Sequence, residues 1–227
     1  MKYSFSRSEV SSRTAGTIGA LAIASRLRSY DGRIRSYLLW AWWVGVAFFA
    51  VYPTMNWLAS QRSTPFHLFV PAELDVPFVP QFIWAYLSMY LLFAIPPVFL
   101  GASQLRALGR QLIAGTLVSG LLFLLFPAQL GFARTVPAEA LYAGIYAAMF
   151  SMDRPYNLVP SLHIVFSAAI ALACADVTGP AARAVLRGWL AVIAASTLLV
   201  HQHHVLDVAA AFALVFLLRR RYEVTYA

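Results

Sequence analysis

The chain has 227 residues, of which 61% are hydrophobic and 11% charged, with a mean hydropathy of +0.70 and a formal net charge of +8. A soluble domain of this length has too little interior for so many apolar side chains, so an ordinary water-soluble protein is excluded. The length allows about six membrane-crossing helices of about 20 residues each, and the single Cys174 excludes a disulfide within the chain.

Residues 1–36 form a basic N-terminal extension. Its first part, in which Lys2 and Arg13 precede the apolar run Thr14 to Ala24, has some features of a cleavable signal peptide. Cleavage there would leave Arg26 to Arg35 outside the cytoplasm, against the usual distribution of basic residues. We therefore expect residues 1–36 to be a cytoplasmic anchor.

Apolar segments follow along the rest of the chain, and we expect six of them to span the membrane. They are Tyr37 to Leu58, Phe78 to Leu100, Leu112 to Gly131, Leu162 to Ala175, Ala184 to Val200, and Val205 to Leu218. Residues 138–150 are apolar over too short a run to cross, which predicts an interfacial or re-entrant helix. The sequence thus predicts an all-α integral membrane six-helix bundle over residues 37–221, followed by a short cytoplasmic tail, residues 222–227.

Basic residues fall unequally on the two sides of this predicted bundle. With the N-terminus inside, only three of the 17 Lys and Arg residues lie on the outer side: Arg62, Arg134 and Arg154. Cytoplasmic loops retain Lys and Arg, so this distribution predicts cytoplasmic termini. The positive charge is then explained by topology and by contact with anionic membrane lipids, without a nucleic-acid partner.

Four of the five histidines lie in two short motifs at the edges of apolar segments: Pro160-Ser161-Leu162-His163 and His201-Gln202-His203-His204-Val205-Leu206-Asp207. Ionisable groups are costly at the margin of the hydrocarbon, so groups found there are functional candidates. His203 and Asp207 are four residues apart, which on a helix would place the carboxylate beside the imidazole. Such a pair fixes the tautomer of the ring and leaves its other nitrogen free to react.

The Pro-Ser-Leu-His motif and the spacing Ser196-Thr197-x5-His203-x3-Asp207 resemble the second and third motifs of the type 2 phosphatidic acid phosphatase superfamily. This resemblance implies that His203 is a nucleophile that forms a phosphohistidine and that Asp207 orients it. It also implies that His163 exchanges protons with the leaving group and with water, and that Ser161 binds a phosphoryl oxygen. Chemistry of this kind needs neither a metal nor another cofactor.

The sequence also departs from that pattern. Thr197 stands where the third motif has an arginine, and the first motif is absent in its usual form, so we expect Arg134 and Arg154 to supply positive charge to the phosphate. Ser196 either binds phosphate or bonds back to its own helix. Classical phosphatases often have glycine at the position of Leu162. With leucine there, the motif resembles that of the branch that includes inositol phosphorylceramide synthases.

We therefore expect a lipid phosphatase whose site opens at the outer face of a bacterial inner membrane, with a lipid phosphate as substrate and membrane lipids as surroundings. One alternative is a headgroup phosphotransferase that resembles inositol phosphorylceramide synthase. Another is a non-catalytic lipid-binding or transport protein with a degenerate site. A third, a metalloenzyme with ligands from His201, His203, His204 and Asp207, is disfavoured because histidine-box enzymes need around eight histidines.

Overall fold

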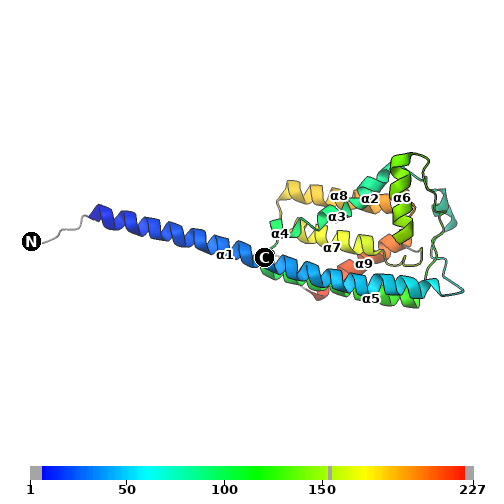
Figure 1. The fold of residues 1–227 in the computed structure, drawn as a ribbon, viewed down its shortest axis with the longest axis horizontal. Coiled ribbons are helices and arrows are strands. Elements are labelled where there is room, and N and C mark those ends of the chain that lie inside the picture. The colour runs from blue at the N-terminus through cyan, green and yellow to red at the C-terminus, as the bar shows by residue number, and fades with distance from the viewer. Residues whose placement is uncertain (1–6, 153–154, 223–227) are drawn as a thin grey trace, which may run out of the picture.

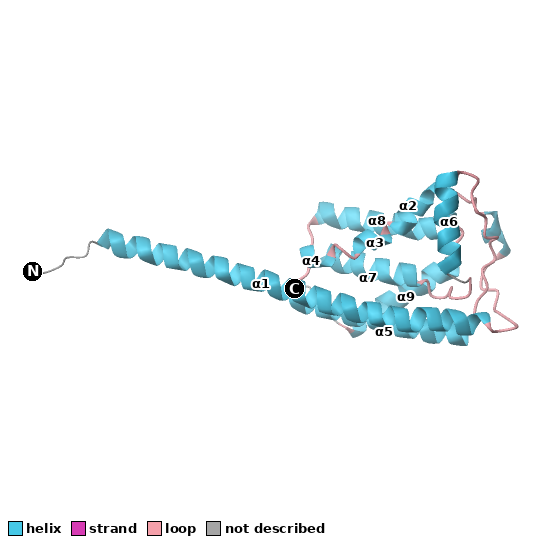
Figure 2. Ribbon diagram, viewed as in Figure 1, coloured by secondary structure: helices cyan, strands magenta, loops and turns pink. Residues whose placement is uncertain are grey.

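A computed structural model describes residues 7–152 and 155–222, with side chains described from Tyr30 onward. Its helices are α1 (Arg7–Ser60), η1 (Pro71–Asp75), η2 (Pro80–Phe82), α2 (Ile83–Leu87), α3 (Met89–Leu92), α4 (Pro96–Phe99), α5 (Ala102–Leu125), α6 (Ala140–Met152), α7 (Leu162–Asp176), α8 (Pro180–Leu199) and α9 (Val205–Arg221). Within these residues there is no β-strand, only an isolated bridge between Phe66 and Ala128. The described part of the chain is therefore all-α (Figures 1 and 2).

The long helices run alongside one another, whereas α6 lies across them at one end (Figure 1). At that end, which we call the site end, the starts of α7 and α9 are joined by a 3.1 Å hydrogen bond from the Ser161 N–H to the Asp207 carbonyl. At the opposite end, the basic end, Arg219 of α9 pairs with Asp176 of α7. Arg183 of α8 also donates to the Ala175 carbonyl over 3.0 Å. Each end of the bundle is thus fixed by polar bonds between helices.

The core of the bundle is α7, which packs against α5, α8 and α9. Almost every residue of α7 is buried, from Ile164 through Ala175. A helix that is apolar all around its circumference is stable only inside a protein or a membrane. The composition of α7 therefore places it at the centre, with the other helices around it.

Helices α1 and α5 are parallel, and they pack closely where glycines of α5 face large side chains of α1. A Cβ added to Gly109 would lie 2.7 Å from the Trp40 ring, and one added to Gly120 would collide with Val51. The two residues of each pair are separated by the same number of positions in the chain, so the two helices keep the same alignment from one pair to the other. Small residues at such contacts let two helix backbones approach closely, as in membrane helix pairs.

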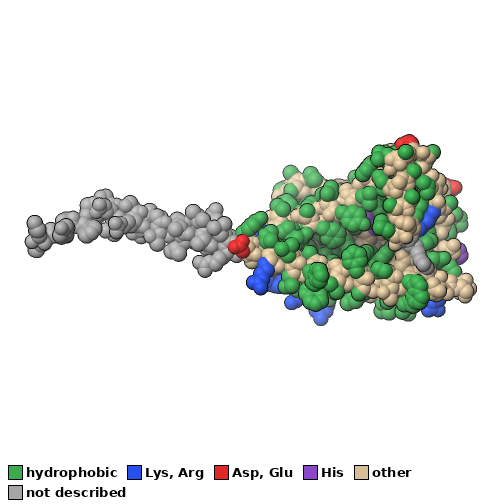
Figure 3. Space-filling model, in the orientation of Figure 1, with side chains coloured by type: hydrophobic (Ala, Val, Ile, Leu, Met, Phe, Trp, Pro, Cys, Tyr) green, Lys and Arg blue, Asp and Glu red, His purple; other side chains and the backbone are tan. Residues whose placement is uncertain are grey.

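Among the described residues, three helices are long and apolar enough to cross a membrane: residues Tyr30–Ser60 within α1, all of α5, and all of α8. Apolar side chains cover much of the visible surface (Figure 3). Trp42 and Phe49 on α1, for example, are 68% and 73% exposed. Large apolar side chains facing outward on a long helix are expected where the surroundings are lipid.

The six-span bundle is not confirmed. The expected second span, Phe78 to Leu100, is wrong as a single helix, because this stretch divides into η2, α2, α3 and α4. Prolines begin two of these pieces, at Pro80 and Pro96, and a turn at Ser88 separates α2 from α3. Two further expected spans, α7 and α9, have only 15 and 17 residues.

Two other expectations have clearer outcomes. The short helix expected near residues 138–150 is confirmed as α6, Ala140–Met152. The expected boundary between residues 36 and 37 falls inside α1, which is continuous from Arg7. Residues 1–6 and 223–227, including most of the expected C-terminal tail, lie outside the described residues.

The Gly109 contact gives a test of the α1–α5 packing. Gly109→Ala should destabilise the protein by about 1–3 kcal/mol, because the new methyl group meets the Trp40 side chain close to its backbone. Gly188→Ala is the matched control, since a Cβ there meets nothing within 4 Å and alanine favours a helix by about 0.5–1 kcal/mol. Thermal unfolding in detergent micelles would measure both, and equal stabilisation by the two variants would contradict the packing.

Candidate functional site

The predicted His203–Asp207 pair lies at the start of α9, with Asp207 in its first turn. The Asp207 Oδ2 atom accepts hydrogen bonds from His203 Nδ1–H at 3.1 Å and from the His204 backbone N–H at 2.8 Å. The pairing is confirmed, but the helical reason for it is wrong, because His203 precedes the helix, which begins at Val205. Asp207 instead acts as a capping residue whose carboxylate also holds the imidazole. With Nδ1 protonated, the lone pair of His203 lies on Nε2.

Glu73 is a second carboxylate at the same helix start, and the sequence did not single it out. Its Oε2 atom accepts from the Val205 backbone N–H at 2.8 Å and from His204 Nδ1–H at 3.2 Å. Its Oε1 atom accepts from the Val70 N–H at 3.2 Å. Burial raises the pKa of this carboxyl, but the two backbone donors and the His204 ring outweigh burial and bring the pKa below its ordinary value. Glu73 is therefore held as an anion.

His204 has a structural role in this geometry. Its Nδ1–H is used by Glu73, and its Nε2 accepts the Gly131 N–H at 3.0 Å. Its ring is stacked between Phe69 and Phe132, each with a centroid distance of 4.5 Å. Burial lowers the pKa of His204 against the opposing carboxylates, so the ring is neutral. From the sequence, we expect His204 either to support the reacting groups or to face solvent. Its position agrees with the first alternative, and the second is wrong because only 1% of the residue is exposed.

His201 continues the same aromatic stack. Its ring lies 4.0 Å from Phe132, and its Nε2 is 2.9 Å from the Val76 carbonyl, to which it donates. Among the described residues, no group of three or more His, Cys, Asp or Glu side chains is placed to hold a metal ion. The ring nitrogens of His201 and His204 are instead hydrogen-bonded to Val76, Glu73 and Gly131, and a metal at His204 Nε2 would displace the Gly131 bond.

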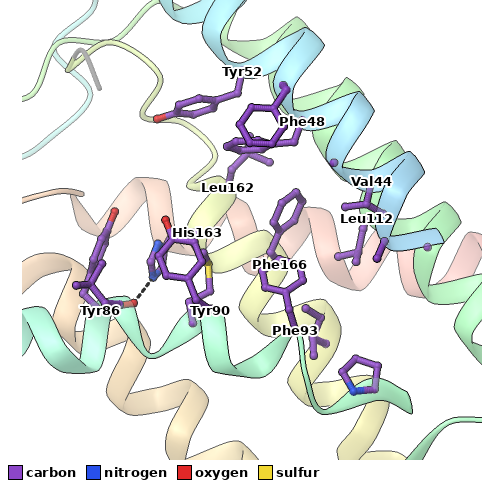
Figure 4. A pocket seen from close by; sticks show the side chains of 18 of the residues that line it. Val44, Phe48, Tyr52, Tyr86, Tyr90, Phe93, Leu112, Leu162, His163 and Phe166 are labelled. Atoms are coloured by element: carbon purple, nitrogen blue, oxygen red, sulfur yellow. Dashed lines mark hydrogen bonds between the residues drawn. The ribbon is translucent and has the colours of Figure 1, made fainter. Parts of the chain in front are cut away.

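The Pro-Ser-Leu-His motif forms the start of α7. Ser161 is the N-cap of this helix, and its buried hydroxyl accepts the Ile164 N–H at 3.3 Å. His163 donates its Nε2–H to the Tyr86 carbonyl at 2.8 Å and stacks on the Tyr86 ring at 3.9 Å, as Figure 4 shows. The backbone bond between Ser161 and Asp207 joins this motif to the start of α9. His163 thus has Nδ1 available for proton exchange.

His163 and His203 line one cavity of about 810 Å³. Its walls are mainly aromatic and aliphatic, with Phe48 and Tyr52 of α1 facing Phe93 and the α7 residue Phe166 (Figure 4). The volume falls within the range of about 300–1,000 Å³ found for small-molecule sites. Two imidazoles that reach the same apolar cavity from different helices make this the candidate site.

The other predicted site residues lie outside this cavity. Ser196 donates to the Ile193 carbonyl at 2.6 Å, and Thr197 donates to the Ala194 carbonyl at 2.8 Å, so both hydroxyls bond back to α8. The Arg134 guanidinium donates to the Phe150 carbonyl at 3.3 Å and lies 5.0 Å from the centre of that ring. Arg154 lies outside the described residues. No Lys or Arg is among the described residues that line the cavity.

Comparisons with known protein families, with curated proteins and with solved structures found no match for this chain. The chemistry of the site is therefore inferred from its own residues and their spacing.

The Glu73 bonds predict a loss of stability on mutation. Glu73→Ala should destabilise the protein by about 1–3 kcal/mol, because buried donors on His204 and Val205 lose their acceptor. Glu139→Ala is the control, since Glu139 is an exposed carboxylate in a loop of the same end. Thermal unfolding in micelles would show the difference. A Glu73→Ala protein as stable as the Glu139→Ala protein would show that these bonds contribute nothing.

The same carboxylate predicts a dependence on pH. Because its folded-state pKa lies below the ordinary value of 4.5, the anion stabilises the fold above that value, and the contribution is lost as the pH falls through the folded-state pKa. The gap in melting temperature between the native protein and Glu73→Gln should therefore shrink between about pH 7 and about pH 3. A gap that widens on acidification would reverse the assigned sign.

Proposed function

We propose that this protein is a membrane-embedded enzyme that transfers the phosphoryl group of a lipid phosphate ester, with water as the acceptor. The observation that supports the proposal most directly is the position of His203, which is oriented by Asp207 and lines an apolar cavity among apolar helices. Its Nε2 atom has no hydrogen-bond partner within the described residues. An imidazole held by a carboxylate, with one nitrogen free, is an activated nucleophile.

In the proposed reaction, His203 Nε2 attacks phosphorus. The new P–N bond forms as the ester P–O bond breaks, and the leaving oxygen takes the proton that the phosphate monoester carries, relayed through Nδ1 of His163 because the Nε2–H of that ring is held by the Tyr86 carbonyl. Water then attacks the phosphorus, His163 accepts its proton, and the P–N bond breaks to release inorganic phosphate. Asp207 offsets the positive charge on the phosphorylated ring. No step of this sequence requires a redox change.

The phosphate still needs positive charge, because its oxygens stay anionic throughout the transfer. Arg154 follows the cavity-lining Met152 by two positions in sequence, so we propose it for this role together with Arg134. When substrate binds, Arg134 exchanges its hydrogen bond to the Phe150 carbonyl for one to the phosphate. Transfer to the hydroxyl of a second headgroup instead of water uses the same first step, and differs only in the acceptor.

The sidedness of the site is part of the proposal. Seven described arginines lie at the basic end in α5, α8 and α9: Arg106, Arg110, Arg183, Arg187, Arg219, Arg220 and Arg221. The site end has Arg62 and Arg134. Basic residues are retained on the cytoplasmic side, so the basic end is proposed to face the cytoplasm and the histidines the outer face of a bacterial inner membrane.

This orientation can be tested with reporters. A periplasm-active enzyme fused after Ala227 should be inactive, and the same enzyme inserted beside Glu139 should be active, because these positions belong to opposite ends. A cytoplasm-active reporter at each position provides the reciprocal control. Exchange of the two signals would invert the proposed orientation.

Turnover should separate the roles of the two cavity histidines. His203→Ala should abolish phosphate release from labelled lipid phosphates, since no nucleophile remains. His163→Ala should reduce the rate by about 10²–10⁴-fold, which is typical for loss of a general acid or base. His67→Ala is the control, because His67 is an exposed histidine that does not line the cavity. A His203→Ala protein with the native rate would disprove the proposed nucleophile.

The acceptor is settled by the products. The same assay, run with a panel of labelled lipid phosphates in the presence and absence of inositol and ceramide, distinguishes hydrolysis from headgroup transfer. Hydrolysis releases inorganic phosphate whatever the acceptor present. Headgroup transfer yields a new labelled lipid only when the acceptor is added.

A further inference from the structure

The cavity extends far from the histidines along α1. Its lining includes Pro53 and Tyr52 near the site end and continues to Trp40 and Tyr37. At a rise of about 1.5 Å per residue, the interval from Tyr37 to Pro53 measures about 24 Å along the helix axis. That length approaches the hydrocarbon thickness of a bilayer, about 30 Å. The cavity is therefore much longer than a phosphate group requires.

At the far end of the cavity, α1 contacts its neighbours. The Tyr37 hydroxyl donates to the Phe93 carbonyl at 2.6 Å, and so bridges α1 to the turn after α3. The Trp40 ring lies against Gly109 of α5, and the Arg110 guanidinium lies 5.9 Å from the centre of that ring. These contacts form a floor at the level of the first turns of α5.

The polarity of the lining changes along this length. Imidazole and amide side chains line the cavity only at its site end, where His163, His203 and Asn157 lie. Asn157 donates to the Tyr52 carbonyl at 3.0 Å, whereas its Oδ1 atom is buried and has no partner among the described residues. A complementary ligand has a polar head with a hydrogen-bond donor, joined to a long apolar tail.

We propose that this cavity holds an extended hydrocarbon chain of the substrate lipid, with the chain tip at Tyr37 and Trp40, and that this floor limits the chain length. The identity of the head group rests on the proposed function, but the place of the chain does not. A chain that reaches the floor gains apolar contact with each added methylene group, and a longer one meets the Tyr37 and Trp40 side chains and gains no further contact inside the cavity. The floor is thus a specificity determinant distant from the histidines.

Gly45 offers a way to shorten the cavity without disturbing the fold. It lines the cavity between the floor and the histidines, and a Cβ added there meets nothing within 4 Å. Gly45→Leu should therefore place an apolar side chain in the path of the lipid. Gly188→Leu is the matched control, because that helical glycine also has open space but does not line the cavity.

The first experiment locates the chain without turnover. Purified protein in micelles is exposed to a long-chain lipid phosphate with a photoreactive diazirine at the chain tip, and the crosslinks are mapped by mass spectrometry. Native protein and Gly188→Leu should be labelled at Trp40 and at the adjacent start of α5, and Gly45→Leu should lose that label at least tenfold. Labelling of Trp42 and Trp43, which are exposed and do not line the cavity, that Gly45→Leu does not change would overturn the proposal.

The second experiment compares lipid phosphates of about 8 and about 16 carbons by competition against a short-chain lipid phosphate whose diazirine lies beside the head group, a probe that does not reach Gly45. Gly45→Leu should weaken the longer competitor at least about tenfold relative to the shorter one, since lost contact with two methylene groups suffices. An unchanged ratio would disprove the length limit. Tip labelling at Trp40 without any phosphate release would support the chain site and disprove the proposed enzyme. Phosphate release without that labelling would support the enzyme and disprove the chain site.

Discussion

Two buried carboxylates at the start of α9 hold the site together. Asp207 binds the His203 ring and the His204 N–H, and Glu73 binds the His204 ring and the Val205 N–H. Together they satisfy backbone donors that a helix start leaves without partners and fix two imidazoles in defined tautomers. Because one acid comes from the helix and the other from the loop after α1, the loop and the helix are positioned as one unit. The direction of the His203 ring depends on this arrangement.

The rest of the molecule brings an apolar space to that ring. The buried α7 helix carries His163 to the same end of the bundle, and its N-cap residue is hydrogen-bonded to Asp207 through the backbone. Glycines on α5 hold α1 in place, so that α1 forms one long wall of the cavity. Charged groups are kept at the two ends, while aromatic and aliphatic side chains occupy the length between them. A lipid with one polar head matches this distribution.

The sequence predicted those parts of the structure that depend on residues close together in the chain. Hydropathy identified α8, the second half of α1 and the part of α5 from Leu112, although it missed the start of α5 at Ala102, and a separation of four residues identified the His203–Asp207 pair. The sequence could not identify partners that only the fold brings together, such as Glu73 and Tyr86, which lie 131 and 77 residues from their histidines. Apolar composition also concealed the breaks between residues 78 and 100, which lie at Pro80, at a turn at Ser88 and at Pro96.

The central claim is that His203 receives the phosphoryl group. Native protein mixed with phosphorus-labelled lipid phosphate and quenched in alkali within the first turnover should carry a base-stable, acid-labile label, and fragmentation by mass spectrometry should place it on His203. Such a result would establish the imidazole as the covalent acceptor. A label found on another residue, or labelling of equal extent in His203→Ala, would contradict the assignment of this site.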